Sequence, residues 1–204
     1  TARCTLSNGI ASLKFATSEV GQGFVTLAPQ IARSVLGVDQ VVQEVSDTQI
    51  GSAGSTSASR QTWMSGGAVD GACRLVRERM FEHVGKLHNI DPIRLLIDGT
   101  DVVDSIGDFR ISVVEATEGV TFSETFEHHH RKTEDLDENG QGNCHVAFAF
   151  VAHRAVVDVD CELGLVKVVQ IATAQDVGKV LNPLSALGQL EGGIAQGLGL
   201  AVME

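Results

Sequence analysis

A stretch of small, hydroxyl-bearing residues, Asp47–Thr62, most constrains how this chain can fold. It joins a β-branched run, Val38–Val45, to a long helical pattern that begins near Gln61. A helix start leaves its first amide groups unpaired and carries partial positive charge, so it attracts anions. Arg60 adds a full charge in a planar fork that suits phosphate. The sequence predicts a cradle for a phosphate or another anionic cofactor group, and the alternative is a solvated loop with a Ser cap.

The glycines of this stretch are not followed by Gly-Lys-Ser/Thr, which argues against an ordinary nucleotide P-loop. The composition of the 204 residues, 43% hydrophobic and 20% charged, is that of a globular protein. A net charge of −11 argues against nucleic-acid partners and against docking on anionic membranes. No apolar run reaches the roughly 20 residues that span a bilayer, and no export leader is visible.

The four cysteines, Cys4, Cys73, Cys144 and Cys161, are far apart and form no Cys-x-x-Cys pair. Zinc or iron–sulfur ligation within the chain is therefore not expected. Reduced thiols in a cytoplasmic protein are the simplest account.

Two local signals shape the amino-terminal part. Asn8-Gly9 is a strong hairpin turn signal between the strand-like runs Arg3–Leu6 and Ala11–Thr17. In Glu19–Gly23, glycines flank Gln22, so the backbone can approach a ligand closely while the amide offers a donor and an acceptor. The alternative for this segment is a plain strand-to-helix turn.

Two helices are expected in this part. The first has apolar residues at helical spacing from Phe24 to Val35 and a C-cap at Gly37, and it either starts close to Pro29 or is kinked there. The second spans about seven turns, and its small residues at Ser65–Ala68 allow very close packing. We expect its apolar stripe and three neighbours to be core residues: Ala68, Val69, Ala72, Val76, Met80, Val84 and Leu87, with Trp63, Met64 and Cys73.

The middle of the chain has weaker patterns. Asp98-Gly99 indicates a second hairpin, Leu95–Ile97 with Val102–Val103, and a short helix is expected near Ile111–Thr117. Val120–Phe126 alternates as a strand, and Lys132–Asn143 is typical of an exposed loop. The triple His128–His130 is not expected to bind a metal ion, because consecutive strand residues point to opposite faces.

The carboxy-terminal part begins with a nearly continuous β run, Cys144–Cys161, whose apolar first half we expect to be central in a sheet. It pairs with Leu165–Ala174. Asn182-Pro183 then starts a helix that contains Gly188, Gly192, Gly193, Gly197 and Gly199. Because each glycine costs a helix about 1 kcal/mol, close contact with a backbone or a flat cofactor is expected to offset the loss. The alternative is a tightly packed helix pair.

These patterns predict an α+β fold of two subdomains with mixed or antiparallel sheets packed by long helices. Residues 1–90 would form a hairpin–helix–strand–helix half with the cofactor loops. Residues 91–143 would form an irregular connecting region, and residues 144–204 a strand pair with the glycine-rich helix. The chain opens without Met, and its last helical pattern still runs at Glu204, so we expect a piece of a longer polypeptide.

Several motifs together resemble the molybdopterin-binding subunit of the xanthine dehydrogenase/aldehyde oxidase family, with the bacterial xanthine dehydrogenases most similar and the carboxy-terminal half of the subunit represented. The matching residues are Glu19-Val-Gly-Gln-Gly23, Ser55-Thr-Ser-Ala-Ser-Arg-Gln-Thr62, Gly66-Gly-Ala-Val69, Gln175-Asp-Val-Gly178, Asn182-Pro183, Gly188-Gln-Leu-Glu-Gly-Gly193 and Gln196-Gly-Leu-Gly199. Their order and spacing cover nearly the whole chain.

The resemblance implies a set of molybdopterin-binding residues. The residues that would sit against the molybdenum–pterin end are Gly21, Gln22 and Gly23. Those that would hold the pterin and its phosphate or dinucleotide tail are Ser55, Thr56, Ser57, Ala58, Ser59 and Arg60. Gln189 would contact the pterin from the glycine helix.

The resemblance also implies what this chain lacks. The catalytic glutamate of the family lies in a Gly-x-Gly-Glu segment that is absent here, so no catalytic residue or metal ligand is assigned. FAD and iron–sulfur clusters would belong to other domains or subunits, and the substrate would be a purine, another N-heterocycle or an aldehyde. By itself the chain is expected to be inactive, to bind no molybdenum, and to self-associate as a homo-oligomer. The alternatives are a non-catalytic cofactor-binding module and a subunit-association module.

Overall fold

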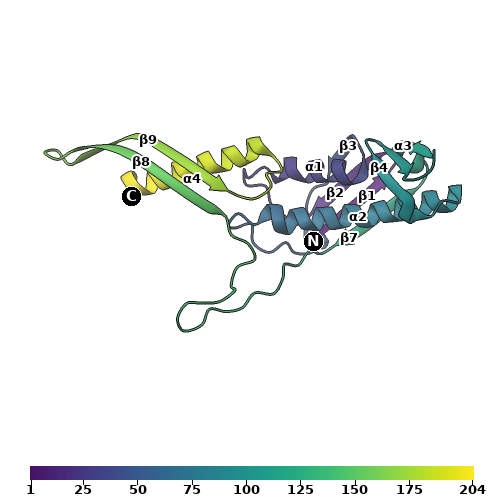
Figure 1. Ribbon diagram of the computed structural model, residues 1–204, viewed down its shortest axis with the longest axis horizontal. Coiled ribbons are helices and arrows are strands. Elements are labelled where there is room, and N and C mark those ends of the chain that lie inside the picture. The colour runs from purple at the N-terminus through teal and green to yellow at the C-terminus, as the bar shows by residue number, and fades with distance from the viewer. The chain divides into compact units, whose positions relative to one another are not determined.

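The computed structural model describes residues 1–204 and divides into two compact units, Thr1–His129 and His130–Glu204 (Figure 1). Each unit combines at least one helix with at least one β-sheet, so the α+β prediction is confirmed. The boundary between the two units lies after His129. Most of the stretch expected to be an irregular connection therefore belongs to the first unit.

A four-stranded sheet forms the base of the first unit, with the order β3-β2-β1-β7. Strand β1 pairs antiparallel with β2 and β7, and β3 runs parallel to β2. The predicted hairpin turn is confirmed, because Asn8 (φ 49°) and Gly9 (φ 73°) both take the left-handed conformation that suits a two-residue turn. The strands span Ala2–Ser7 (β1), Ile10–Phe15 (β2), Gln40–Gln43 (β3) and Thr121–Phe126 (β7).

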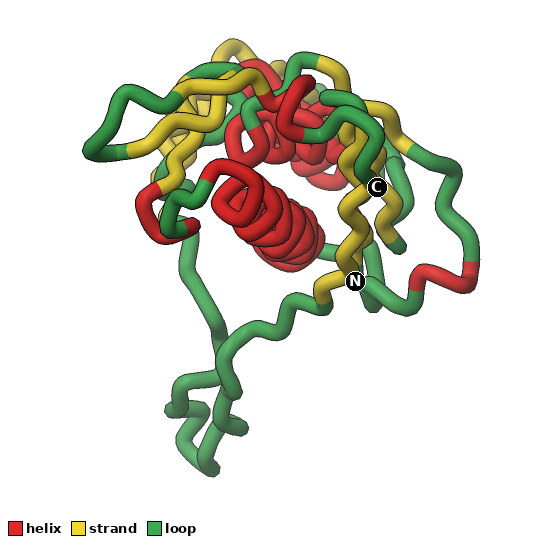
Figure 2. The backbone as a smooth tube through the Cα atoms, turned by 90° about the vertical axis from the view of Figure 1, so that its right-hand side faces the viewer, coloured by secondary structure: helices red, strands yellow, loops and turns green.

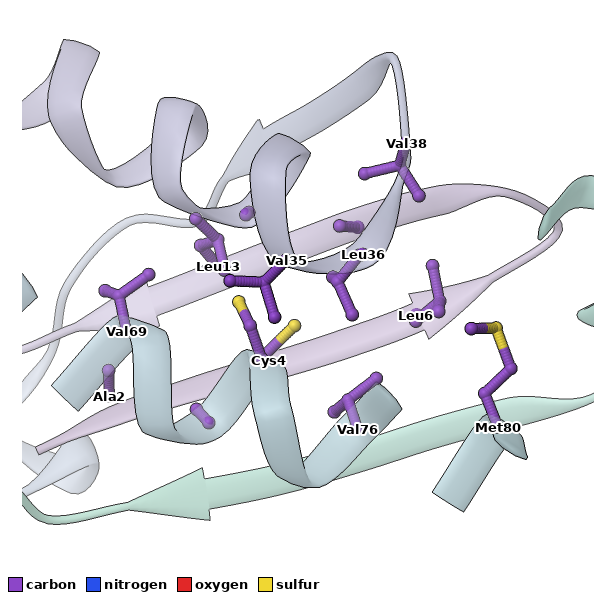
Figure 3. Packing of buried hydrophobic residues seen from close by; sticks show 14 of the residues in the cluster. Ala2, Cys4, Leu6, Leu13, Val35, Leu36, Val38, Val69, Val76 and Met80 are labelled. Carbon is purple, nitrogen blue, oxygen red and sulfur yellow. The ribbon is translucent and has the colours of Figure 1, made fainter. Parts of the chain in front are cut away.

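Two helices, α1 (Phe24–Leu36) and α2 (Gln61–His88), pack against each other and against this sheet. Alternate residues of β1 and β2 point into the core between them, where Cys4, Leu6 and Leu13 meet Val76 and Met80 (Figure 3). Figure 2 views α2 nearly along its axis. Glycines bring α2 close to β7, since a Cβ at Gly71 would lie only 2.2 Å from the Phe126 ring.

The stripe expected on α2 is buried from Ala68 to Val84, and Cys73 is fully buried, while Met64 is half-buried. Two core predictions are wrong, because Trp63 is 57% exposed and Leu87 is 66% exposed. Trp63 lies two residues from the buried Gln61, and at about 100° per residue its side chain points away from the core face. Leu87 lies in the last turn of α2 and is not covered there.

Helix α1 begins at Phe24 and continues through Pro29. Proline has no amide hydrogen, so the carbonyl four residues earlier, that of Val25, loses its helical partner. The Gln43 side-chain amide from β3 donates to this carbonyl instead. The helix therefore does not need to start near the proline.

A small three-stranded sheet, β4-β5-β6, completes the first unit. The predicted hairpin and the predicted short helix are both present. The helix starts with a reciprocal cap between Ser112 and Glu115. The elements are β4 (Leu95–Asp98), β5 (Asp101–Asp104), β6 (Arg110–Ser112) and α3 (Val113–Ala116), with short 3₁₀ turns at Thr48–Ile50 and Pro92–Arg94.

The second unit consists of a two-stranded antiparallel ribbon and one helix: β8 (Phe150–Asp160), β9 (Leu165–Asp176) and α4 (Pro183–Met203). The expectation of a central strand starting at Cys144 is wrong, because β8 begins at Phe150 and has one neighbouring strand. Its apolar residues remain largely exposed, Phe150 at 69%. No helix of the chain is both long and apolar enough to cross a membrane.

Candidate functional site

A small group of buried polar side chains joins the end of β2 to the start of α2. Thr17, Gln61 and Ser65 are 3%, 6% and 5% exposed. The Thr17 hydroxyl lies 3.2 Å from Gln61 Oε1, and the hydroxyls of Thr17 and Ser65 are hydrogen-bonded to each other. Ser65 also donates to Gln61 Oε1. The group lies at one end of the first unit. It is next to Ser18–Gly23 and Ser55–Arg60, the two segments expected to contact the cofactor.

The first of these segments, Ser18–Gly23, closes over the start of α1. Glu19 accepts hydrogen bonds from the amides of Gly21 (2.8 Å), Gly23 (2.9 Å) and Val25 (3.0 Å). Partial burial raises the pKa of the Glu19 carboxyl, but the backbone amides together outweigh it and hold this pKa below its usual range. The anion-attracting end of α1 is therefore occupied by the chain's own carboxylate.

Gln22 lies half-buried in the same turn. Its Oε1 accepts from the Val20 amide at 2.7 Å, and its Nε2 donates to the Ser18 carbonyl at 2.9 Å. A carboxamide has two donor hydrogens and two acceptor lone pairs, so each end keeps one free. Gln22 can thus offer one donor and one acceptor to a ligand without leaving the loop.

The second segment, Ser55–Arg60, is a loop in which neither the backbone amides nor the side chains form a hydrogen bond. The start of α2 that follows has no side-chain cap and no acidic residue in its first turn. The amides of Thr62 and Trp63 have no acceptor. The prediction of a loop with unpaired donors before a helix start is confirmed. Its role in holding a cofactor stays a prediction.

Arg60, at the N-cap position of α2, forms no ion pair. Its guanidinium borders the backbone of Gly54, where a Cβ would lie 3.4 Å from Nη1. The cation also lines a polar hollow of about 190 Å³, whose wall is formed by Thr1, Ser52–Gly54, Met64, Ser65 and Glu127–His129. The expected concavity is therefore present beside the loop, but Ser52–Gly54 and not Ser55–Ser59 line it.

Backbone strain marks the same loop. Ala58 has φ 54°, a left-handed conformation that is uncommon for a residue with a Cβ. A salt bridge fixes the entry to the stretch, since Lys14 Nζ lies 2.6 Å from Asp47 Oδ2. The salt bridge thus anchors the start of the stretch Asp47–Thr62, and Ala58 takes a left-handed conformation shortly before α2.

The remaining candidate, Gln189, lies in the second unit, on the exposed surface of α4. Asn182 caps this helix by accepting from the Ser185 amide at 3.0 Å, and Pro183 takes the first helical position as predicted. A Cβ at any of the five α4 glycines would meet no atom within 4 Å. The expected close contact along this helix stays a prediction.

Sequence reasoning missed the residues that position the loops. Glu19 was seen only as the start of a glycine motif, and Thr17, Gln61 and Ser65 were not singled out. His128 was also missed as a packing residue, although its ring lies edge-on to Trp63 at 5.8 Å. An acidic residue before a Gly-x-Gly turn and a helix start was the one local signal available.

The first unit thus has an α2 start whose first amides have no acceptor and whose N-cap arginine forms no ion pair. The chain matches the model of the molybdopterin cofactor-binding domain family over residues 2–204. It belongs to that family, and the resemblance described above is confirmed.

Relatives of known name agree with this assignment. The chain is 26% identical to the large subunit of nicotine 6-hydroxylase from Paenarthrobacter nicotinovorans, over 97% of the chain and 25% of that subunit. It is 28% identical to xanthine dehydrogenase/oxidase from Gallus gallus, over 97% of the chain and 14% of the relative. The crystal structure of quinoline 2-oxidoreductase from Pseudomonas putida 86 shares the fold, with a TM-score of 0.78, 22% identity, and coverage of 97% and 26%. The chain thus spans about a quarter or less of the length of these relatives.

The residues present fit a molybdopterin group at the second segment. Unpaired amides, four hydroxyls between Ser55 and Ser59, and an unpaired Arg60 are the donors that a phosphate-bearing group requires. At the first segment, Ser18–Gly23, fewer donors remain for the cofactor, because Glu19 already accepts hydrogen bonds from the amides of Gly21 and Gly23. Gln22 is the free donor and acceptor there.

Proposed function

We propose that this chain supplies part of the cofactor-binding surface of a larger molybdenum hydroxylase, which hydroxylates a purine, another N-heterocycle or an aldehyde. The family match over residues 2–204 carries the proposal. Relatives named nicotine 6-hydroxylase and xanthine dehydrogenase/oxidase support the class of reaction. Their substrates differ, so the substrate of this protein is assigned only by class.

In this proposal the two segments of the first unit have separate tasks. Arg60 and the amides of Thr62 and Trp63 bind the phosphate or dinucleotide tail, and the hydroxyls of Ser55–Ser59 bind the pterin. Gln22 donates to the molybdenum–pterin end from the turn of Gly21–Gly23. Gln189 contacts the pterin from α4. When bound, the cofactor supplies the redox chemistry of oxidative hydroxylation, while the chain binds and orients it.

The chain provides no general base in this assignment. In this proposal the electron carriers, namely FAD and iron–sulfur clusters, belong to other domains or subunits. Four free thiols favour a reducing compartment, which we take to be the cytoplasm. Exposed apolar residues on α4, such as Leu200 (64%), support association with further domains or with a second copy.

A subunit-association module is the second candidate. The observation in its favour is that α4 has no buried residue although it carries many Leu, Ile and Val side chains. A non-catalytic cofactor-binding module would use the same donors of Ser55–Arg60 but show no turnover.

The experiment is to purify the polypeptide that contains this chain and to measure its molybdenum and pterin content, with turnover assays on xanthine, an aldehyde and an N-heterocycle. Molybdenum and pterin at about one per polypeptide, with turnover of one substrate class, is the expected result. Pterin without turnover would favour the non-catalytic module, and a preparation without pterin would overturn the proposal.

A further inference from the structure

We propose that Gln61 is a positioning residue that fixes the two cofactor-binding segments relative to each other. The inference rests on the proposed function and assigns a role to a residue that belongs to neither segment. Gln61 is the first residue of α2 and is 6% exposed. Its carboxamide contacts Thr17, two residues after β2, Ser65 from the next turn of α2, and the Ser55 carbonyl at the start of the segment Ser55–Arg60.

The hydrogen bonds of this group require a carboxamide. Oε1 of Gln61 is the acceptor within reach of the Thr17 and Ser65 hydroxyls, whose two hydrogens serve two of the three contacts in this group, and Nε2 donates to the Ser55 carbonyl at 3.4 Å. A carboxylate could replace the acceptor but not the donor, and an apolar side chain could replace neither. Because the site is buried, a missing partner would leave a polar group without a hydrogen bond. The Gln61 side chain is therefore both the hydrogen-bond acceptor and the donor of this group.

The positions of these partners explain why the group matters for the cofactor. Thr17 directly precedes the segment Ser18–Gly23, and Ser55 opens the segment Ser55–Arg60. No hydrogen bond joins the two segments directly. The link between them passes through Gln61. Without it, each segment would keep its local structure but would lose its fixed distance from the other.

A binding surface divided between two loops gains affinity when both are held in place before the ligand arrives. The loop Ser55–Ser59 makes no hydrogen bond with its amides, so Gln61 is its nearest buried anchor. We expect loss of the Gln61 carboxamide to loosen the loop first and to weaken cofactor retention as a consequence.

The first test needs no cofactor. In the 204-residue chain, trypsin cleavage at the Arg60–Gln61 bond is followed by mass spectrometry for the wild type and for Gln61→Met, Gln61→Glu and Thr17→Val. Each substitution is expected to raise the cleavage rate about five- to tenfold, the factor for one or two lost hydrogen bonds. Thr17→Ser keeps the hydroxyl and is expected to restore the wild-type rate.

Thr17→Val is the informative variant, because Thr17 is far in sequence from the cleaved bond. Val84→Ala, a fully buried position later in α2, serves as the stability control. It lowers global stability without touching the group and is expected to leave cleavage at Arg60 unchanged when global unfolding is negligible. Equal cleavage in the wild type, Gln61→Met and Thr17→Val would overturn the inference.

The second test uses the polypeptide that contains this chain with its cofactor. Gln61→Met and Thr17→Val are expected to lower pterin retention after gel filtration about tenfold, and Thr17→Ser is expected to retain it. Unchanged retention in a protein that binds pterin would overturn the positioning role. If the unsubstituted protein contains no pterin, the proposed function fails instead, and the cleavage rates show whether Gln61 still orders the loop.

Discussion

The two long helices of the first unit start at the same end of the sheet, yet their first backbone amides differ in whether they have a hydrogen-bond acceptor. At α1 the amides of Gly21, Gly23 and Val25 all donate to the Glu19 carboxylate. At α2 the amides of Thr62 and Trp63 have no acceptor, and the N-cap residue is the cation Arg60. One helix start is closed by the chain, and the first amides of the other have no acceptor within the chain.

Under the proposed function, this difference predicts that stability depends on the α1 start and cofactor binding on the α2 start. A capped helix start stabilises the fold, while an uncapped start with an adjacent arginine costs stability and leaves donors that can bind an anion. The cost is tolerated because α2 is anchored elsewhere, by a buried stripe from Ala68 to Val84 and by close approach to β7. The comparison therefore predicts that substitutions at the α1 start change stability and that substitutions at the α2 start change cofactor binding.

The largest effect is expected from Arg60→Ala in the cofactor-containing polypeptide. Loss of a charge-assisted hydrogen bond should weaken cofactor binding by about 1.5–3 kcal/mol, or about 10- to 150-fold. Molybdenum content per polypeptide, measured after dilution and gel filtration, checks this. Arg74→Ala is the control, because Arg74 is an exposed arginine of the same helix that pairs with Asp70 at 2.6 Å. Unchanged molybdenum content in Arg60→Ala would break the comparison.

Glu19→Ala tests the closed helix start. Removing the carboxylate should lower the free energy of unfolding by about 0.5–2 kcal/mol, the range for a lost helix cap. The pKa of Glu19 lies below its ordinary value of 4.5, so the carboxylate stabilises the fold above that pH. This contribution is lost as the pH falls through the lowered pKa of the folded state. Denaturant unfolding at pH 7 and near pH 3 should therefore show a smaller difference between the wild type and the variant in acid.

Glu78→Ala is the matched control for this experiment, because Glu78 is an exposed glutamate of α2 that makes no hydrogen bond through its side chain. Its substitution should change stability by less than about 0.5 kcal/mol at either pH. A Glu19→Ala protein with wild-type stability at pH 7 would show that the α1 start does not depend on its carboxylate.

The smallest effect is expected from Thr62→Glu, which gives α2 the acidic first turn that it lacks. The added carboxylate should stabilise the helix by about 0.3–1 kcal/mol, less at high salt. It should also compete with the anionic group of the cofactor and lower molybdenum content. Thr62→Gln controls for side-chain size. If Thr62→Glu gained stability and kept its full cofactor content, the open helix start would not be where the anion binds.

The local parts of the fold could be predicted because their causes lie within a few residues. Asn8-Gly9 takes the left-handed pair of conformations that a two-residue hairpin turn requires. The stripe Ala68–Val84 has the helical period, and Asn182-Pro183 carries a cap and a proline for the first turn. For the same reason the loop Ser55–Ser59 was predicted, since its small polar residues favour neither a helix nor a strand.

The errors arose where burial depends on distant elements. Trp63 was expected in the core as a neighbour of the apolar stripe, but the core face of α2 is set by contact with α1, β1 and β7, and Trp63 points away from it. The run from Cys144 was expected to be a central strand because both faces are apolar. A strand is central only when it has two neighbours, and β8 has one.

The sequence by itself determined the α+β class, the donor-rich loop before α2 and the family resemblance, because turn chemistry, hydrophobic period and motif order are all written along the chain. Only the tertiary structure decided that α1 is closed by Glu19 and α2 is open, and that Gln61 links Thr17 to Ser55. Thr17 and Gln61 are 44 residues apart, and their hydrogen bond forms only after the β2–α1–β3 segment has brought β2 and α2 together. Pairings of this kind depend on how the chain folds back on itself, and no local pattern encodes them.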